Sequence, residues 1–113
     1  MIQIYHNSRC GKSRDCLAFL EKSGNEFEII NYLKEIPTFD ELKLIIKKLK
    51  IKPIELVRKK EKIWIDHFKN KDLNDDEIIK TMIENPILIE RPIVINGNQA
   101  IIARPLENIK KII

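Results

Sequence analysis

The part of the chain that decides the fold is residues 2–22, IQIYHNSRCGKSRDCLAFLEK. Its first four residues alternate apolar and polar side chains and are rich in β-branched and aromatic types, which predicts a β-strand over residues 2–5. A polar segment follows. Apolar residues then recur at helical spacing until Ser23-Gly24-Asn25 ends the pattern. The stretch therefore predicts a strand that passes through a polar loop into an amphipathic helix.

The next part of the chain adds a second strand and a helical segment. Residues 27–33 are expected to form a strand, and the strand–helix–strand order implies parallel pairing with a right-handed crossover. Helices are then predicted to begin at Thr38 and at Asn74, whose side chains suit the N-cap position. Shorter helical pieces are expected over residues 51–73. We therefore expect an inserted helical segment over about residues 37–89.

In the last third of the chain, the spacing of apolar residues changes from that of helices to that of strands. Asn-Gly is the strongest short turn signal, so Asn96-Gly97 between the apolar runs 93–95 and 100–102 predicts a hairpin. Pro105 fits the first turn of a final helix. The expected fold class is α/β, with a mixed four-stranded sheet, βαβ followed by ββα. This order is similar to a thioredoxin-like fold with an inserted helical segment, in one domain over residues 1–113.

Composition narrows the function classes. A chain of 113 residues fits one domain, and 21 basic against 17 acidic residues give a mild net charge of +4. Two cysteines, and no cationic-then-apolar leader at Met1, argue against a disulfide-rich secreted scaffold. No apolar run approaches the roughly 20 residues that cross a bilayer. We expect a cytoplasmic domain with no membrane partner.

A basic stretch lies within the helical segment. Residues 43–62 carry nine basic and two acidic side chains. A nucleic-acid surface is one interpretation, but the stretch lacks interleaved aromatic residues and any known binding motif. We favour a solvated helical face and expect no nucleic-acid partner.

Cys10 is the candidate nucleophile. It lies between the first predicted strand and the first predicted helix. The free N–H groups at the start of a helix favour an anion there. Arg9 and Arg14 add nearby positive charge. A thiolate attacks electrophiles, whereas a neutral thiol is a weak nucleophile. The alternative is a half-buried structural cysteine.

Three familiar motifs fail on spacing. A P-loop needs glycine where His6 stands, a cysteine phosphatase loop needs arginine where Cys16 stands, and a redox C-x-x-C needs cysteine where Ser13 stands. Along a helix, Cys16 is about 9 Å from Cys10, beyond the ~7 Å between Cα atoms that a disulfide allows. We expect Cys16 to be a core residue. An outside thiol must then resolve any intermediate on Cys10.

Three arginines and one histidine complete the set of candidates. Arg91 enters one hairpin strand and Arg104 leaves its partner, so the two Arg-Pro pairs are expected to lie close together. Together with Arg58 they suit a tetrahedral oxyanion; the alternative is that each caps a carboxylate or a helix end. His6 is a loop hydrogen-bonding group, a cation that tunes the thiolate, or purely structural. The histidines and cysteines show no metal-ligand spacing.

These residues resemble the glutaredoxin-dependent, ArsC-type arsenate reductase family, and in particular its short YfgD-like branch. The resemblance covers nearly the whole chain. It rests on the combination of four segments, residues 4–14 (IYHNSRCGKSR), 55–61 (ELVRKKE), 85–94 (NPILIERPIV) and 103–105 (ARP).

The resemblance implies a function and its participants. Cys10 would attack arsenate or a similar oxyanion. Glutathione, as co-substrate, would attack the adduct, and glutaredoxin would reduce the mixed disulfide, with no bound cofactor. The peptide bond between Arg91 and Pro92 would be cis. The implied site residues are Cys10 and His6 for catalysis, with His6 helping to lower the thiol pKa, and Arg58, Arg91, Arg104, Asn7 and Gly11 for substrate binding.

Two other functions stay open at this point. One is a thiol oxidoreductase acting on a different substrate. The other is a transcriptional regulator like Spx, which shares the fold and binds RNA polymerase. Spx-type chains carry C-x-x-C and lack the third arginine, so Ser13 and Arg104 favour the enzyme. We expect a monomer.

Overall fold

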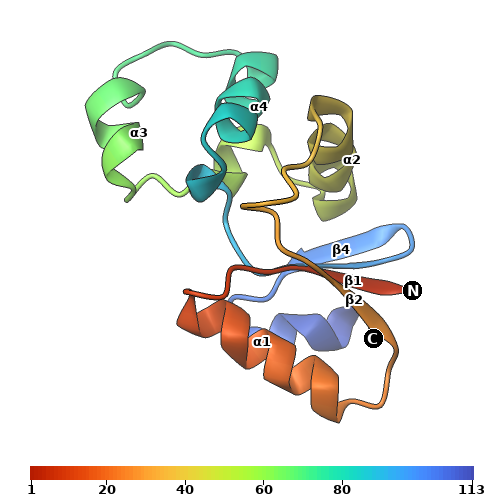
Figure 1. The fold of residues 1–113 in the computed structure, drawn as a ribbon. Helices are drawn as coiled ribbons and strands as arrows, with labels where there is room; N and C mark the ends of the chain where they lie inside the picture. The colour runs from red at the N-terminus through yellow and green to blue at the C-terminus, as the bar shows by residue number, and fades with distance from the viewer. The chain divides into compact units, whose positions relative to one another are not determined.

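The structure, a computed structural model, describes all 113 residues. The chain divides into two compact units, one made of residues 1–35 and 91–113 and the other of residues 36–90. The helices expected over about residues 37–89 lie in the second unit (Figure 1). The organisation of the whole chain as a single domain stays a prediction.

The first unit is built on a four-stranded mixed sheet. Its strands are β1 (Ile2–Tyr5), β2 (Phe27–Ile30), β3 (Ile93–Asn96) and β4 (Gln99–Ile102), in the order β2-β1-β3-β4. β1 pairs with β2 in parallel and with β3 antiparallel, and β3 pairs antiparallel with β4. This is the thioredoxin-like arrangement predicted from the sequence.

The hairpin between β3 and β4 is confirmed, with a small shift in its turn. Asn96 pairs with Gln99, so the two central turn residues are Gly97 and Asn98. Gly97 has φ 61°. Asn98 does not have a positive φ, so the turn has the pattern of type II′, in which glycine at the first central position has no steric cost.

Two predicted boundaries were wrong. The second strand ends at Ile30 instead of residue 33, because the carbonyl of Asn31 accepts hydrogen bonds from the N–H groups of Lys34 and Glu35 and turns the chain. The final helix, η3 (Leu106–Lys111), is a 3-10 helix. Pro105 precedes it in an extended conformation instead of occupying its first turn.

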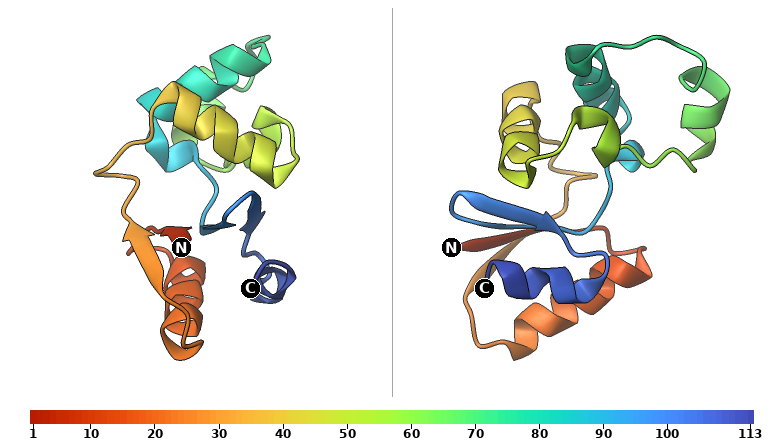
Figure 2. Two further views of the ribbon diagram at one scale, coloured as in Figure 1. Left: turned by 90° about the vertical axis from the view of Figure 1, so that its right-hand side faces the viewer. Right: turned by 180° about the vertical axis from the view of Figure 1, so that it is seen from behind.

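Helix α1 (Gly11–Lys22) and η3 cover one face of the sheet (Figure 2). The core between these helices and the strands is apolar, and it consists of Ile2, Ile4, Cys16, Leu20, Val94, Ala103, Ile109 and Ile112. This packing holds α1 against β1. The loop that joins them carries Cys10.

The second unit is helical. It contains α2 (Phe39–Leu49), η1 (Pro53–Leu56), α3 (Lys62–His67), α4 (Asp75–Glu84) and η2 (Pro86–Leu88). Thr38 and Asn74 are the N-caps of α2 and α4, as predicted. In both capping boxes the cap side chain accepts the backbone N–H of a glutamate three residues later, whose carboxylate accepts the cap's own N–H.

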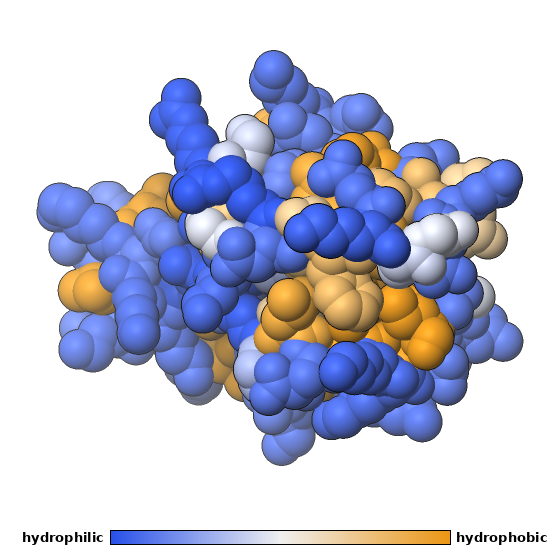
Figure 3. All heavy atoms as spheres, turned by 90° about the horizontal axis from the view of Figure 1, so that it is seen from below, coloured by the Kyte–Doolittle hydropathy of each residue, from blue (hydrophilic) through white to orange (hydrophobic).

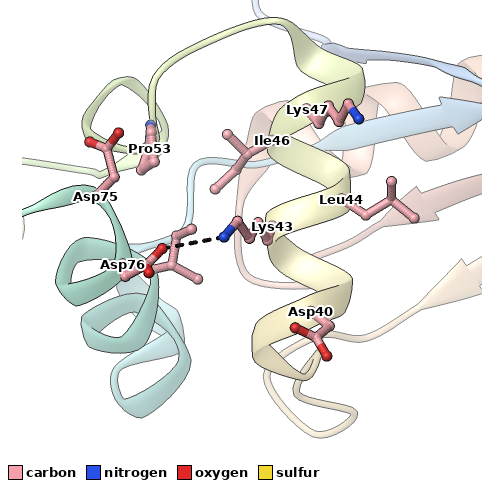
Figure 4. Close-up of a pocket in the computed structure, with 9 residues that line it drawn as sticks. Asp40, Lys43, Leu44, Ile46, Lys47, Pro53, Asp75 and Asp76 are labelled. Carbon is pink, nitrogen blue, oxygen red and sulfur yellow. Dashed lines mark hydrogen bonds and ion pairs between the residues drawn. The ribbon is translucent and has the colours of Figure 1, made fainter.

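A pocket of about 550 Å³ lies between α2 and α4. Ile46 and Ile79 contribute apolar lining, and Nζ of Lys43 on α2 lies 3.5 Å from Oδ1 of Asp76 on α4 (Figure 4).

In the view from below, hydrophilic side chains dominate; the broadest apolar area lies right of centre, and smaller apolar areas lie elsewhere (Figure 3). None of the helices has the length and apolar character needed to span a membrane.

Candidate active site

The loop between β1 and α1 places the sulfur of Cys10 at the start of a helix. Cys10 is the N-cap residue of α1 and has an extended backbone, with φ −96° and ψ 121°. Its N–H donates to the carbonyl of Asn7 at 3.0 Å, and its carbonyl accepts the N–H of Arg14 at 3.0 Å. A thiolate here lies beside the unpaired N–H groups of the first helical turn.

Two arginines converge on this sulfur. Arg104 donates from Nη2 to the Cys10 sulfur at 3.1 Å and from Nε to the carbonyl of Arg91 at 2.7 Å. Arg91 is buried, and its side chain also hydrogen-bonds to Cys10. The two Arg-Pro pairs therefore meet, as the hairpin predicted. The peptide bond between Arg91 and Pro92 is cis, and so is the one between Arg104 and Pro105.

The thiol of Cys10 is acidic in this setting. Burial alone would raise its pKa, but hydrogen bonds from the Ser13 backbone and from Arg91 oppose burial, as do the charge and hydrogen bond of Arg104. The net effect lowers the pKa of Cys10 below its ordinary value. Because the thiolate is the attacking species, the structure supports Cys10 as a nucleophile.

Ser13 is a site residue that sequence reasoning missed. It is fully buried, and its Oγ lies 2.6 Å from Nδ1 of His6 and accepts the N–H of Asn7 at 3.0 Å. The side-chain oxygen of Asn7 in turn accepts the N–H of Arg9 at 2.9 Å. The two bonds of Ser13 tie the loop to α1, and the bond between the Asn7 side-chain oxygen and the N–H of Arg9 shapes the loop itself. The contact of Asn7 with substrate stays a prediction.

His6 is buried and makes its hydrogen bond within the loop. Burial lowers its pKa, the backbone of Ser13 opposes this effect, and the positive charge of Arg14 lowers the pKa further. The ring therefore favours its uncharged form. Of the roles open from the sequence, the structure displays the hydrogen bond within the loop; the influence of His6 on the thiol stays a prediction.

Arg58 lies in the other unit, among carboxylates. It donates to Glu90 at 2.7 Å and to Glu61 at 3.3 Å, and its backbone N–H donates to the carbonyl of Leu88. Burial would lower its pKa, but these two carboxylates raise it. This pairing is the alternative that the sequence left open for each arginine. The contact of Arg58 with an oxyanion stays a prediction.

The remaining candidates are Gly11 and Cys16. Gly11 begins α1 and is exposed; a Cβ built there would come no closer than 3.8 Å to its nearest neighbour, Arg14. Cys16 is 0% exposed, and burial raises its pKa to about 11. It is the core residue that the sequence predicted. No group of three or more His, Cys, Asp or Glu side chains is arranged to hold a metal ion.

The start of α1 carries a thiol of lowered pKa, faced by two arginines that each precede a cis-proline, in a thioredoxin-like fold. The family model described as "ArsC family" matches residues 5–112. The chain belongs to the ArsC family.

Similar proteins support this assignment over nearly the full length. An arsenate reductase of Haemophilus influenzae is 42% identical, covering 97% of both chains. The uncharacterized protein YfgD of Escherichia coli is 36% identical, covering 99% of this chain and 96% of its own. A solved structure of an arsenate reductase from Vibrio cholerae has a TM-score of 0.93 at 38% identity, covering 99% of this chain and 97% of its own.

Proposed function

We propose that this chain reduces arsenate to arsenite, with the Cys10 thiolate as the nucleophile. The observation that carries the proposal is the 3.1 Å contact between Arg104 and the Cys10 sulfur at the start of α1. The same guanidinium stabilises a thiolate and attracts a tetrahedral anion to it. Relatives of similar length named arsenate reductase, at 37% and 42% identity, support an oxidoreductase acting on arsenate.

The proposed binding residues provide positively charged guanidinium groups and a backbone N–H group. Arg91 and Arg104 would hold arsenate oxygens beside the sulfur, and Arg58 would add a third guanidinium, as the family resemblance implies. The N–H of Gly11 would donate to an arsenate oxygen, because the first N–H groups of a helix have no partner within the helix. Asn7 would complete the site through the loop that it shapes.

The proposed reaction has two covalent steps. The Cys10 thiolate attacks arsenic, one arsenate oxygen leaves as water after protonation, and an S–As bond forms. The thiolate of glutathione then attacks the sulfur of Cys10. The electron pair of the S–As bond stays with arsenic, which is reduced from As(V) to As(III) and leaves as arsenite. Glutaredoxin reduces the resulting disulfide between Cys10 and glutathione.

The position of Cys16 supports an external reductant. This thiol is fully buried and its pKa is raised, so it lacks both the access and the ionisation that a resolving cysteine needs. We further propose that the chain works as a monomer in the cytoplasm, where glutathione keeps thiols reduced, and that no nucleic acid takes part.

A coupled assay tests the proposal. The chain is mixed with arsenate, glutathione, glutaredoxin and glutathione reductase, and NADPH oxidation is followed. We expect arsenate-dependent turnover that Cys10→Ser abolishes and that Cys16→Ala, the matched control, retains. Turnover of the unmodified chain no greater than that of Cys10→Ser would overturn the proposal.

The same variants separate arsenate from other substrates. If the site is built for an oxyanion, Arg91→Ala abolishes arsenate reduction while leaving any reaction with a glutathionylated peptide less affected. Equal losses with both substrates, with the peptide as the faster one, would instead indicate a general thiol oxidoreductase. Capture of RNA polymerase by the chain would favour the regulator.

A further inference from the structure

The hydroxyl of Ser13 lies between two hydrogen-bonding groups. Whether each group donates or accepts determines where the hydroxyl proton lies. Ser13 is fully buried. Its oxygen lies 3.0 Å from the backbone nitrogen of Asn7 and 2.6 Å from Nδ1 of His6. A backbone N–H only donates, so the hydroxyl is the acceptor toward Asn7. The hydroxyl proton remains to be donated, and the other group within hydrogen-bond distance of the oxygen is the ring of His6.

That partner is Nδ1 of His6. A buried hydroxyl proton left without an acceptor costs the desolvation of a polar group, so buried hydroxyls are almost always paired. Nδ1 accepts this proton only if it carries a lone pair. The proton of the imidazole ring is then on Nε2, and the ring is neutral.

The charges around the ring agree with this assignment. His6 is 6% exposed, so a charge on it would be poorly solvated. The positive charge of Arg14 acts on the same ring and also disfavours a second cation. Nearby, Arg91 and Arg104 already supply positive charge to Cys10.

The backbone of Ser13 also faces the reactive sulfur. It is among the groups that lower the pKa of the Cys10 thiol. Ser13 is the third residue of α1 and Cys10 is its N-cap residue, so the two residues lie within one helical turn of each other. The side chain of Ser13 therefore ties the loop to the same residue whose backbone stabilises the thiolate.

We propose that Ser13 is a positioning residue, whose hydroxyl accepts from Asn7 and donates to a neutral His6, and thereby fixes the Ser13 backbone against the Cys10 sulfur. His6 then acts on the thiolate through Ser13, and it contributes no positive charge. The inference deepens the proposed function, but its first test needs no substrate, so its failure is distinguishable from failure to reduce arsenate.

The tautomer of His6 is measured directly on the unmodified chain. Long-range ¹H–¹⁵N correlation spectra at pH 7 separate the three ring states, and His67→Gln identifies the signals of the other histidine. We expect Nδ1 of His6 to be unprotonated and Nε2 to carry the proton. A proton on Nδ1, in a neutral or a charged ring, would overturn the proposal.

Two substitutions at position 6 test how His6 acts on Cys10. In His6→Asn the amide oxygen takes the place of Nδ1 and still accepts, whereas the longer side chain of His6→Gln places its amide near Nε2; both remove any charge. We expect the pH profile of Cys10 alkylation to be nearly unchanged in His6→Asn. In His6→Gln and in Ser13→Ala we expect it to move upward by roughly half a unit or more. Equal upward shifts in His6→Asn and His6→Gln would show that charge mattered, and would overturn the proposal.

Discussion

Nη2 of Arg104 lies 3.1 Å from the sulfur of Cys10, although the two residues are 94 positions apart in the sequence. Two strand pairings produce this proximity: Ile93 at the start of β3 pairs with Tyr5 at the end of β1 and with Ile102 at the end of β4, so the segments that carry Cys10, Arg91 and Arg104 leave the sheet at the same end. A cation at this distance favours the thiolate over the thiol. The acidity of Cys10 therefore depends on a residue from the far end of the chain.

Removing Arg104 should make the thiol less reactive at neutral pH. In Arg104→Ala we expect the pKa of Cys10 to rise by roughly one unit or more, since one nearby opposite charge is lost. The thiolate fraction at pH 7 falls, and iodoacetamide labels Cys10 more slowly. Lys110→Ala, which removes an exposed charge from η3, serves as the control and should label at the rate of the unmodified chain. Equal labelling of Arg104→Ala and this control would contradict the prediction.

Cys16 should make the fold sensitive to alkaline pH. Its pKa in the folded chain is about 11, whereas an unfolded cysteine titrates near about 8.5. Between these values the folded state holds the proton that the unfolded state has lost, so stability falls as pH rises. Urea unfolding from pH 8 to 11 should show a loss of roughly 2–3 kcal/mol that is missing from Cys16→Ala. Parallel curves for the two proteins would exclude this effect.

Gly11 tests whether an anion approaches the start of α1. A Cβ at this position meets nothing closer than 3.8 Å, so Gly11→Ala should keep the fold and leave its stability unchanged or raised by up to ~1 kcal/mol. If arsenate approaches the Gly11 N–H, the added methyl group should raise KM severalfold.

Gly24→Ala is the matched control for this substitution. Gly24 has φ 78°, a conformation that costs any other residue, so stability should fall by about 1 kcal/mol while KM stays the same. An unchanged KM in Gly11→Ala would place the anion elsewhere.

The two capping boxes should stabilise the helical unit more than its surface ion pair does. Thr38→Ala and Asn74→Ala each remove a side chain that accepts a helix N–H, at a cost of about 1 kcal/mol. Lys43→Gln removes the pair with Asp76, in which both side chains are more than half exposed, and should change stability by less than ~0.5 kcal/mol. Chemical denaturation of the three variants gives the comparison, and a larger effect for Lys43→Gln would refute it.

Local patterns predicted the elements that carry the site. The alternation in β1, the spacing in α1 and the turn at Gly97 are each determined within a few residues, so they were identified correctly. The meeting of Arg91 and Arg104 followed from hairpin geometry alone. Element ends were less predictable: β2 stops early because a turn at Asn31 outweighs the strand propensity of the residues after it.

The side-chain partners of Ser13 and Arg58 were the part of the site that the sequence did not predict. Ser13 occupies an ordinary helix position, and its importance comes from His6 and Asn7, which lie on the preceding loop. Arg58 shows the same limit, because its partner Glu90 is 32 residues away. Such pairings depend on how the segments pack in the folded chain, and the spacing of apolar residues along the sequence does not predict that packing.

The bond from Nε of Arg104 to the carbonyl of Arg91 has an energetic consequence for substrate capture. A free arginine side chain samples many rotamers and loses that freedom on binding, at about 0.5–1.5 kcal/mol for an immobilised side chain. Arg104 is already held by its bonds to Arg91 and Cys10 before any anion binds, so this entropy loss was incurred once, during folding. An arriving oxyanion meets a preorganised guanidinium, and more of the attraction between them remains as affinity.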